Sequence, residues 1–275
     1  MNRILILFIV SVFALNACSG SKKTFRTRAH KTDQQFNDDD TIAEIRFGRN
    51  LAARILGKYS PWKNKKALRY LNLIGSGVVA QMGRTDLEFY FTILDTDEIN
   101  AYAIPGGYVF ITRGAIELME NEAQLVGAIA HEIAHINQRH IVKKMNIRGA
   151  DNAFLASISA AAGGGAVSGV TALDRKLAQA IDALFGTGLD KQLEIDADQE
   201  GIQMIMALGY NWKSYNDFLV KIDNQLYQNR RKIISKTHPP IQERIKRLYA
   251  IAEAEGMLDY IGKLNKKRFN DNIRN

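Results

Sequence analysis

Residues 125–136 read LVGAIAHEIAHI, a stretch that places His131 and His135 four residues apart with Glu132 between them. On an α-helix, four residues advance by about 400°, so the two imidazoles lie one turn apart on nearly the same face. This spacing allows one nitrogen of each ring to bind a single metal ion at about 2.0–2.1 Å. Glu132 is rotated by about 100° from His131, which places its carboxyl beside the ion. There it can accept a proton from an activated water.

The sequence around this motif indicates a buried helix. Asn121 is a favourable N-cap, and Gln124 three residues later completes a capping-box pattern. The residues beside the histidines are apolar nearly all round the predicted helix. Two histidines and a glutamate would be costly in such surroundings if they had no partner. A chance H-E-x-x-H on an amphipathic helix is therefore the weaker interpretation.

A third metal ligand is available in residues 193–198, which read LEIDAD. Glu194 and Asp198 are four residues apart, so they share one face of a helix that we expect to run to Leu208 and end at Gly209. With Glu194 as a ligand, and Asp198 accepting a hydrogen bond from a ligand histidine, the ion keeps one position for water. A solvated acidic helix start is the alternative, because the helix dipole favours carboxylates there.

A third histidine follows the motif closely. We expect the motif helix to continue to Met145, which would place His140, nine residues after His131, about 900° round and on the opposite face. We interpret His140 as either a surface histidine or one that supports a ligand. Gln138 and Ile141 stand where the H-E-x-x-H-x-x-G-x-x-H metallopeptidases need Gly and His, so that class is excluded.

The start of the chain has the features of a secretion signal. Arg3 is followed by an apolar run over residues 4–15, which is too short for a convincing membrane-spanning helix. The run ends in LNAC, residues 15–18, which resembles the lipobox of bacterial lipoproteins, where cleavage leaves a lipid-bearing cysteine. Cys18 is the only cysteine, so an intrachain disulfide is excluded. Ordinary signal cleavage and an uncleaved anchor are the alternatives; by resemblance, Ser19 favours sorting to the outer membrane.

The composition is that of an ordinary globular protein, with 275 residues, 46% hydrophobic and 24% charged. The formal net charge is +8, and much of the excess lies in residues 22–31 and 263–274. We interpret both segments as solvated tails, although the first could favour an anionic headgroup layer beside a lipid anchor. No nucleic-acid-binding motif is visible, so we expect no nucleic-acid partner.

The domain organisation predicted from these patterns has four parts: a signal peptide at 1–17, a flexible tether at 18–40, a metal-binding domain at 41–255 and a basic tail at 256–275. Helices are predicted at 41–56 and 65–82. Residues 151–190 are rich in small residues around three glycines, and we expect short helices that form a lid or, less favoured, a membrane contact.

Three strands are predicted at 87–94, 100–104 and 108–112, the last two joined by a tight turn at 105–107. They indicate a small antiparallel sheet in a mainly helical α+β domain. An edge of this sheet could bind an extended peptide through backbone hydrogen bonds. The residues expected to contact such a peptide are Asn100, Ala101, Tyr102 and Ala103.

Taken together, these motifs resemble the gluzincin metallopeptidases, the family of HtpX and the CAAX prenyl proteases. HEIAH is followed some sixty residues later by E-x-D-A-D; residues 100–107 (NAYAIPGG) are similar to the family's N-A-F-A-x-P-G-G segment, and residues 237–240 (THPP) with Arg244 to its S/T-H-P-P-x-x-x-R segment. The resemblance covers residues 41–250 and implies a zincin-like peptidase domain. It is greatest to the periplasmic lipoprotein members of the LoiP, YcaL and BepA type, here without membrane helices or a repeat domain.

The resemblance implies one zinc ion per chain, held by His131, His135 and Glu194. It makes Glu132 the general base and then the general acid.

It also implies that Asp198 supports a ligand and pairs with Arg244, and that His238 steadies the oxyanion of the reaction. The expected function is a lipid-anchored zinc metalloendopeptidase that hydrolyses misfolded or misassembled envelope proteins on the periplasmic side of the outer membrane, with inner-membrane or secreted locations as alternatives. A zinc-stabilised, chaperone-like lipoprotein with little proteolysis is the second hypothesis. A structural lipoprotein without metal is the third.

Overall fold

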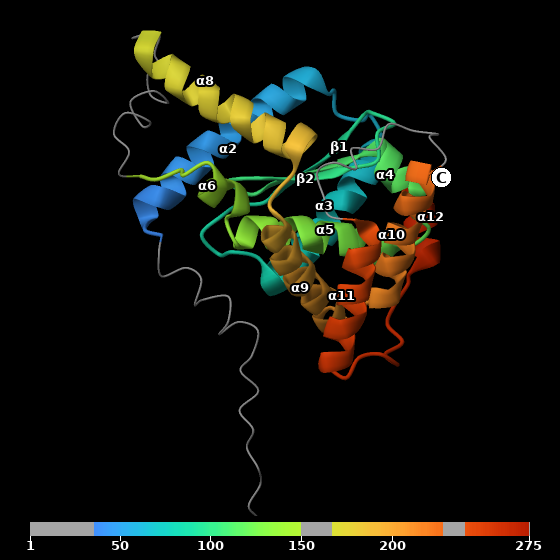
Figure 1. The fold of residues 1–275 in the computed structure, drawn as a ribbon. Coiled ribbons are helices and arrows are strands. Elements are labelled where there is room, and N and C mark those ends of the chain that lie inside the picture. Colours follow the sequence, from blue (N-terminus) through green and yellow to red (C-terminus); the bar gives the residue numbers. More distant parts are fainter. Residues whose placement is uncertain (1–35, 150–166, 228–239, 275) are drawn as a thin grey trace, which may run out of the picture.

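The structure, a computed structural model, describes residues 36–149, 167–227 and 240–274. The predicted signal peptide, Cys18 and His238 lie outside these residues. Within them, no helix has the length and hydropathy needed to cross a membrane. Figure 1 shows the helices arranged around a small sheet, and the elements in chain order are α2 (Asp38–Lys58), α3 (Lys65–Met82), β1 (Tyr90–Leu94), β2 (Ala101–Ile104), β3 (Tyr108–Thr112), α4 (Arg113–Leu118), α5 (Glu122–Asn137), α6 (His140–Lys144), α8 (Val167–Asp182), the π-helical turn η2 (Ala183–Thr187), α9 (Lys191–Ala207), α10 (Trp212–Tyr227), α11 (Ile241–Ala254) and α12 (Lys266–Ile273).

The sheet is mixed rather than antiparallel. Its strand order is β1-β3-β2, with β3 antiparallel to β2 and parallel to β1. Gly106 and Gly107, with φ of 76° and 92°, make the tight turn that pairs β2 with β3. Because β3 then lies between the other two strands, β1 pairs with a strand that runs in its own direction. The mainly helical α+β class predicted from the sequence is confirmed, and β2 is a terminal strand of the sheet.

Both faces of the sheet are covered by helices. On one face Ile93, Val109 and Ile111 pack into a core shared with α3 and α5. On the other face Tyr102 and Phe110 pack against α2 and α8, two helices that lie next to each other in Figure 1. Sheet burial on both sides explains why the strands read as nearly continuous apolar runs. It also fixes β2 between the two cores.

Helix α5 is buried along almost its whole length, as its sequence predicts. The Asn121 side chain accepts a hydrogen bond from the Gln124 amide at 3.1 Å, and the Gln124 side chain accepts one from the Glu120 amide at 2.7 Å. The helix ends at Asn137, not at Met145, because the chain turns at the next residues before α6 begins. Because of this turn, His140 does not lie on the face of α5 opposite His131, where an unbroken helix would have placed it.

At both ends of the described chain, helices include residues that were predicted to belong to a flexible tether and a solvated tail. Helix α2 begins inside the predicted tether, where Asn37 and Asp40 form a reciprocal capping box. The predicted tail contains α12, whose Phe269 is fully buried in the core against α3 and α5. Arg268 of the same helix pairs with Glu122 in the first turn of α5. The interpretation of residues 263–274 as a solvated tail is therefore wrong.

Phe269→Ala should lower the free energy of unfolding by about 3–5 kcal/mol, because it leaves a cavity between α12 and α3. The measurement is urea unfolding of the purified protein. The control is Lys267→Ala on the same helix, whose side chain is 90% exposed, and which should change stability by no more than about 0.5 kcal/mol. Equal effects of the two substitutions would contradict the packing of α12.

Candidate active site

Helices α5 and α9 lie side by side and supply the candidate ligands from facing surfaces. Their backbones approach closely at Gly201, where a Cβ would lie 3.3 Å from the His131 Cα and N. Glu200 joins the same two helices, since its carboxylate accepts hydrogen bonds from Asn137 at 2.6 Å and Gln138 at 2.8 Å. These hydrogen bonds hold the end of α5 against the middle of α9.

His131, His135 and Glu194 meet at one point in the interior. The two Nε2 atoms lie 3.1 Å apart, His131 Nε2 lies 3.5 Å from Glu194 Oε2, and His135 Nε2 lies 3.4 Å from Glu194 Oε1. Donors that bind one tetrahedral ion at about 2.0–2.2 Å are about 3.3–3.6 Å apart. Two imidazoles and a carboxylate are also a donor set typical of zinc. The three residues, which are 0–2% exposed, therefore fit a metal ion.

The far side of His131 is held by an ion pair. Its Nδ1 lies 3.1 Å from Asp198 Oδ1, and Asp198 receives hydrogen bonds from Arg244 Nη2 at 2.6 Å and Nε at 2.9 Å. Arg244 Nη2 also donates to the Tyr215 hydroxyl at 3.0 Å. The expected pairing of Asp198 with Arg244 is present, and it extends to a tyrosine on α10.

The charges of this group are set by its neighbours. Burial and Arg244 act to lower the pKa of His131, but hydrogen bonds to Asp198 and Glu194 outweigh them and raise it to about 9. Burial acts to raise the pKa of Asp198, while Arg244 and His131 pull it well below its usual range. The carboxylate behind His131 is therefore ionised, and its charge is balanced by Arg244.

The far side of His135 meets another histidine. Its Nδ1 lies 2.7 Å from Nδ1 of His140, the first residue of α6. His140 is 1% exposed, and burial lowers its pKa to about 3. The prediction left His140 as either a surface residue or a support for a ligand; the structure excludes the surface interpretation.

A small cavity connects the candidate ligands with the sheet. Its lining comprises the polar residues Glu132, His135 and Glu194, three residues of β2 (Ala101, Tyr102 and Ala103), and the apolar residues Ala183, Leu184 and Leu189. The Tyr102 ring stacks on Phe185 of η2 at 4.3 Å. The structure thus brings the predicted base, two of the candidate ligands and the β2 edge to one cavity.

The sequence model of peptidase family M48 matches residues 65–252, more than half of the chain. The chain belongs to peptidase family M48. This match confirms the resemblance drawn from the motifs. One relative is metalloprotease LoiP of Escherichia coli (strain K12), which is 24% identical over 161 residues. The matched residues cover 58% of this chain and 61% of that protein.

Two further M48 relatives match more of the chain. The β-barrel assembly-enhancing protease of Escherichia coli (strain K12) is 28% identical over 213 residues, which are 74% of this chain and 42% of that protein. The mitochondrial metalloendopeptidase OMA1 of Schizosaccharomyces pombe is 23% identical over 226 residues, 78% of this chain and 63% of that protein. The chain thus spans less than half the length of the β-barrel assembly-enhancing protease. These matches support a metalloendopeptidase.

Some features of this M48 site could not be read from the sequence. Tyr215 is one residue of a helix with no motif of its own, and only its buried contact with Arg244 reveals it. Of the residues expected to contact a peptide, Ala101, Tyr102 and Ala103 line the cavity, and the Asn100 side chain accepts a hydrogen bond from Ala101 N at 2.9 Å. Of the predicted lid, residues 151–166 lie outside the described part of the structure, whereas Ala183 and Leu184 line the cavity.

Glu200→Gln should stabilise the metal-free protein more at pH 8 than at pH 5. Burial raises the pKa of Glu200 from 4.5 to about 7, although Asn137 and Gln138 oppose it. The folded state then binds this proton more tightly than the unfolded state, so stability falls as pH rises from about 4.5 to about 7. Thermal unfolding at both pH values measures the effect. Exposed Glu253→Gln serves as the control, and an equal shift at both pH values for Glu200→Gln would contradict the raised pKa.

Proposed function

We propose that this protein is a zinc-dependent metalloendopeptidase of the bacterial envelope. The observation that carries the proposal is the single cavity shared by Glu132, the ligand pair His135 and Glu194, and the β2 edge. A metal-binding group alone would suit a structural ion. A glutamate and a strand edge beside that group suit hydrolysis of an extended chain.

The residues divide the chemistry among them. When bound by His131, His135 and Glu194, zinc supplies the Lewis acidity that activates a water and polarises a carbonyl. Glu132, which is next to His131 in sequence and lines the cavity, takes the proton of the attacking water and passes it to the leaving amine.

Two further groups act around this centre. Asp198, charged and paired with Arg244, fixes the orientation of the His131 ring through Nδ1. His238 is proposed, by resemblance to the M48 motif, to steady the negative charge that develops on the carbonyl oxygen.

The substrate proposed here is an unfolded or misassembled envelope protein. β2 is a terminal strand of the sheet, so an extended segment can pair with its backbone irrespective of side chains. The name of the β-barrel assembly-enhancing protease associates that M48 relative with assembly of β-barrel proteins. A lipid on Cys18 would place the domain at the periplasmic side of the outer membrane, where such proteins assemble.

Glu132→Gln should reduce cleavage of an unfolded protein by about 10²–10⁴-fold, because it removes the base but keeps the shape of the side chain. The purified variant should retain one zinc per chain. Cleavage rates and metal content are measured together, with Glu253→Gln as the control that keeps full activity. A Glu132→Gln protein that holds zinc and cleaves at the wild-type rate would refute the assigned base.

The same variant tests the chaperone-like alternative. If binding without hydrolysis is the function, then Glu132→Gln expressed from its own promoter complements a deletion strain as well as the wild type does. We expect it to fail, and to accumulate with the proteins that the wild type degrades. A protein that binds no zinc after purification would support the metal-free structural alternative.

Cys18→Ala should abolish metabolic labelling of the protein with a radioactive fatty acid, because the thiol that carries the lipid is lost. The protein should then move from the membrane fraction to the soluble periplasmic fraction. Ser19→Ala is the control, with labelling expected to persist. Unchanged labelling of Cys18→Ala would place any lipid elsewhere.

A further inference from the structure

The two ring nitrogens of His135 face different partners. Nε2 faces His131 and Glu194, at 3.1 and 3.4 Å, on the side of the candidate metal. Nδ1 faces Nδ1 of His140 at 2.7 Å, and the two rings meet edge to face at a centroid distance of 4.9 Å. Both histidines are buried, so this nitrogen pair lies in the protein interior.

A hydrogen bond between two imidazole nitrogens needs one proton, and its position decides the tautomers of both rings. If His135 binds the metal through Nε2, that nitrogen carries the lone pair and Nδ1 carries the proton. His135 Nδ1 then donates, so His140 Nδ1 must accept and His140 carries its own proton on Nε2. The opposite arrangement would place the proton of His135 on Nε2, between the candidate ligands.

We propose that His140 is a positioning residue, whose imidazole accepts a hydrogen bond from His135 Nδ1 and thereby fixes the ring orientation and tautomer that direct the His135 Nε2 lone pair toward the metal. The proposal rests on the metal site proposed above. Its role is like that of Asp198 behind His131, but the acceptor is different.

The backbone conformation that brings His140 to His135 is set by Arg139. Arg139 has φ of 54° and ψ of 40°, the left-handed conformation, which ends α5 and turns the chain back at α6. For a residue with a side chain, this conformation costs about 1–2 kcal/mol. Without the turn, His140 would continue along α5 and point away from the ligands.

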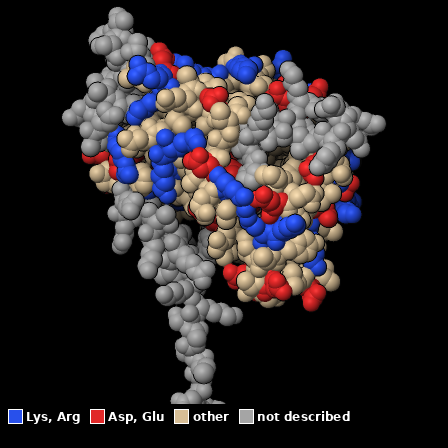
Figure 2. Space-filling model, viewed as in Figure 1, with Lys and Arg blue, Asp and Glu red and all other residues tan. Residues whose placement is uncertain are grey.

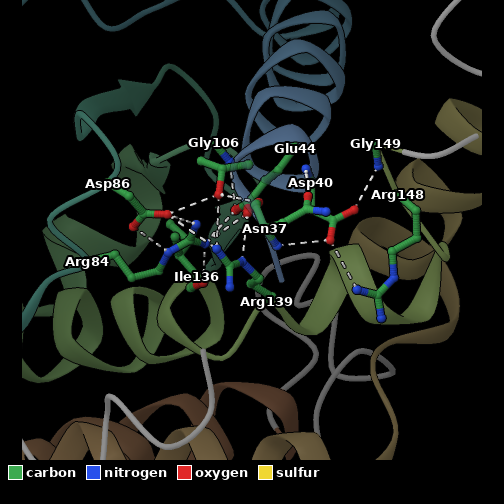
Figure 3. Close-up of polar contacts among 11 residues, drawn as sticks. Asn37, Asp40, Glu44, Arg84, Asp86, Gly106, Ile136, Arg139, Arg148 and Gly149 are labelled. Carbon is green, nitrogen blue, oxygen red and sulfur yellow. Dashed lines mark hydrogen bonds and ion pairs between the residues drawn. The ribbon is translucent and has the colours of Figure 1, made fainter. Parts of the chain in front are cut away.

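Contacts of the Arg139 side chain hold this turn. Its guanidinium donates to Glu44 at 3.1 Å and to Asp86 at 3.2 Å, as Figure 3 shows. Glu44 is fully buried on α2, and its carboxylate also accepts hydrogen bonds from Arg84 at 2.8 Å and from the Gly106 amide at 3.3 Å. The position of His140 therefore depends, through Arg139, on a network of ion pairs that includes Glu44 of α2.

The two ligand histidines consequently have different supports. His131 is backed by a carboxylate, and Arg244 balances the charge of that carboxylate. Behind His135 lies an imidazole instead of a carboxylate, and it adds no negative charge near the ion. Of the three candidate ligands, Glu194 alone is a carboxylate, so a divalent ion bound there would keep a net positive charge, which favours activation of water.

Two substitutions separate positioning from simple space filling. Asn has an oxygen near the position of the histidine Nδ1, so His140→Asn keeps an acceptor for His135, whereas His140→Leu fills the space without one. Zinc affinity is measured by competition with a chelator of known affinity. His140→Leu should bind zinc about 10–100-fold more weakly than the wild type, and His140→Asn should recover most of the loss.

The results distinguish this proposal from the metal site on which it rests. A wild-type protein that binds no zinc refutes the proposed function. Wild-type binding with an unchanged affinity in His140→Leu, or equal losses in both variants, overturns only the role of His140. Circular dichroism and urea unfolding of the metal-free variants show whether they are folded.

A measurement on the wild type decides the question even if His140→Leu does not fold. In the zinc-loaded protein, ¹⁵N NMR of the histidine rings reports which nitrogen of each ring bears hydrogen. We expect a proton on Nδ1 of His135, and on Nε2 but not Nδ1 of His140. A proton found on Nδ1 of His140 would overturn the proposal.

Discussion

The close packing of α5 against α9 is the contact on which the candidate active site depends. A small residue makes the approach possible, since a Cβ at Gly201 of α9 would lie 3.3 Å from the His131 backbone and 3.6 Å from that of Ala130 on α5. A larger side chain there would separate the helices. Because ligand bonds tolerate little change in length, a separation of even one ångström would move Glu194 out of reach of the two histidines.

Buried charges connect this helix pair with the rest of the domain. Asp198 pairs with Arg244 of α11, and Glu44 of α2 pairs with both Arg84 and Arg139. Each pair joins segments that are distant in the sequence. Such pairs contribute little net stability compared with apolar packing, but loss of one partner leaves an uncompensated charge and is strongly destabilising. The apolar cores provide the driving force for folding, whereas the ion pairs specify how the helices meet at the site.

The centre of the site could be predicted because its geometry is local. HEIAH and the Glu194–Asp198 pair each occupy one continuous helix, so a spacing of four residues is enough to place their side chains together. His140 could not be placed in this way, since the angular argument assumes an unbroken helix and Arg139 breaks it. A left-handed arginine held by distant acids has no signature in the sequence.

The strand positions could also be predicted from local sequence patterns, but the parallel pairing of β1 with β3 joins distant segments and could not. In α12, Phe269 and Ile273 have the spacing of a buried helix face, a signal that the surrounding basic residues obscured.

The Glu44 carboxylate has a consequence for how a peptide would be presented. One of its oxygens accepts the amide of Gly106, in the turn that follows β2, while its other oxygen accepts Arg139, beside the residue that backs His135. The same carboxylate therefore contacts both the turn after β2 and the residue next to His140. A chain pairing with β2 would therefore run at a fixed distance from the reacting centre, so the position of the strand rather than a side-chain pocket would bring a peptide bond to the candidate ligands.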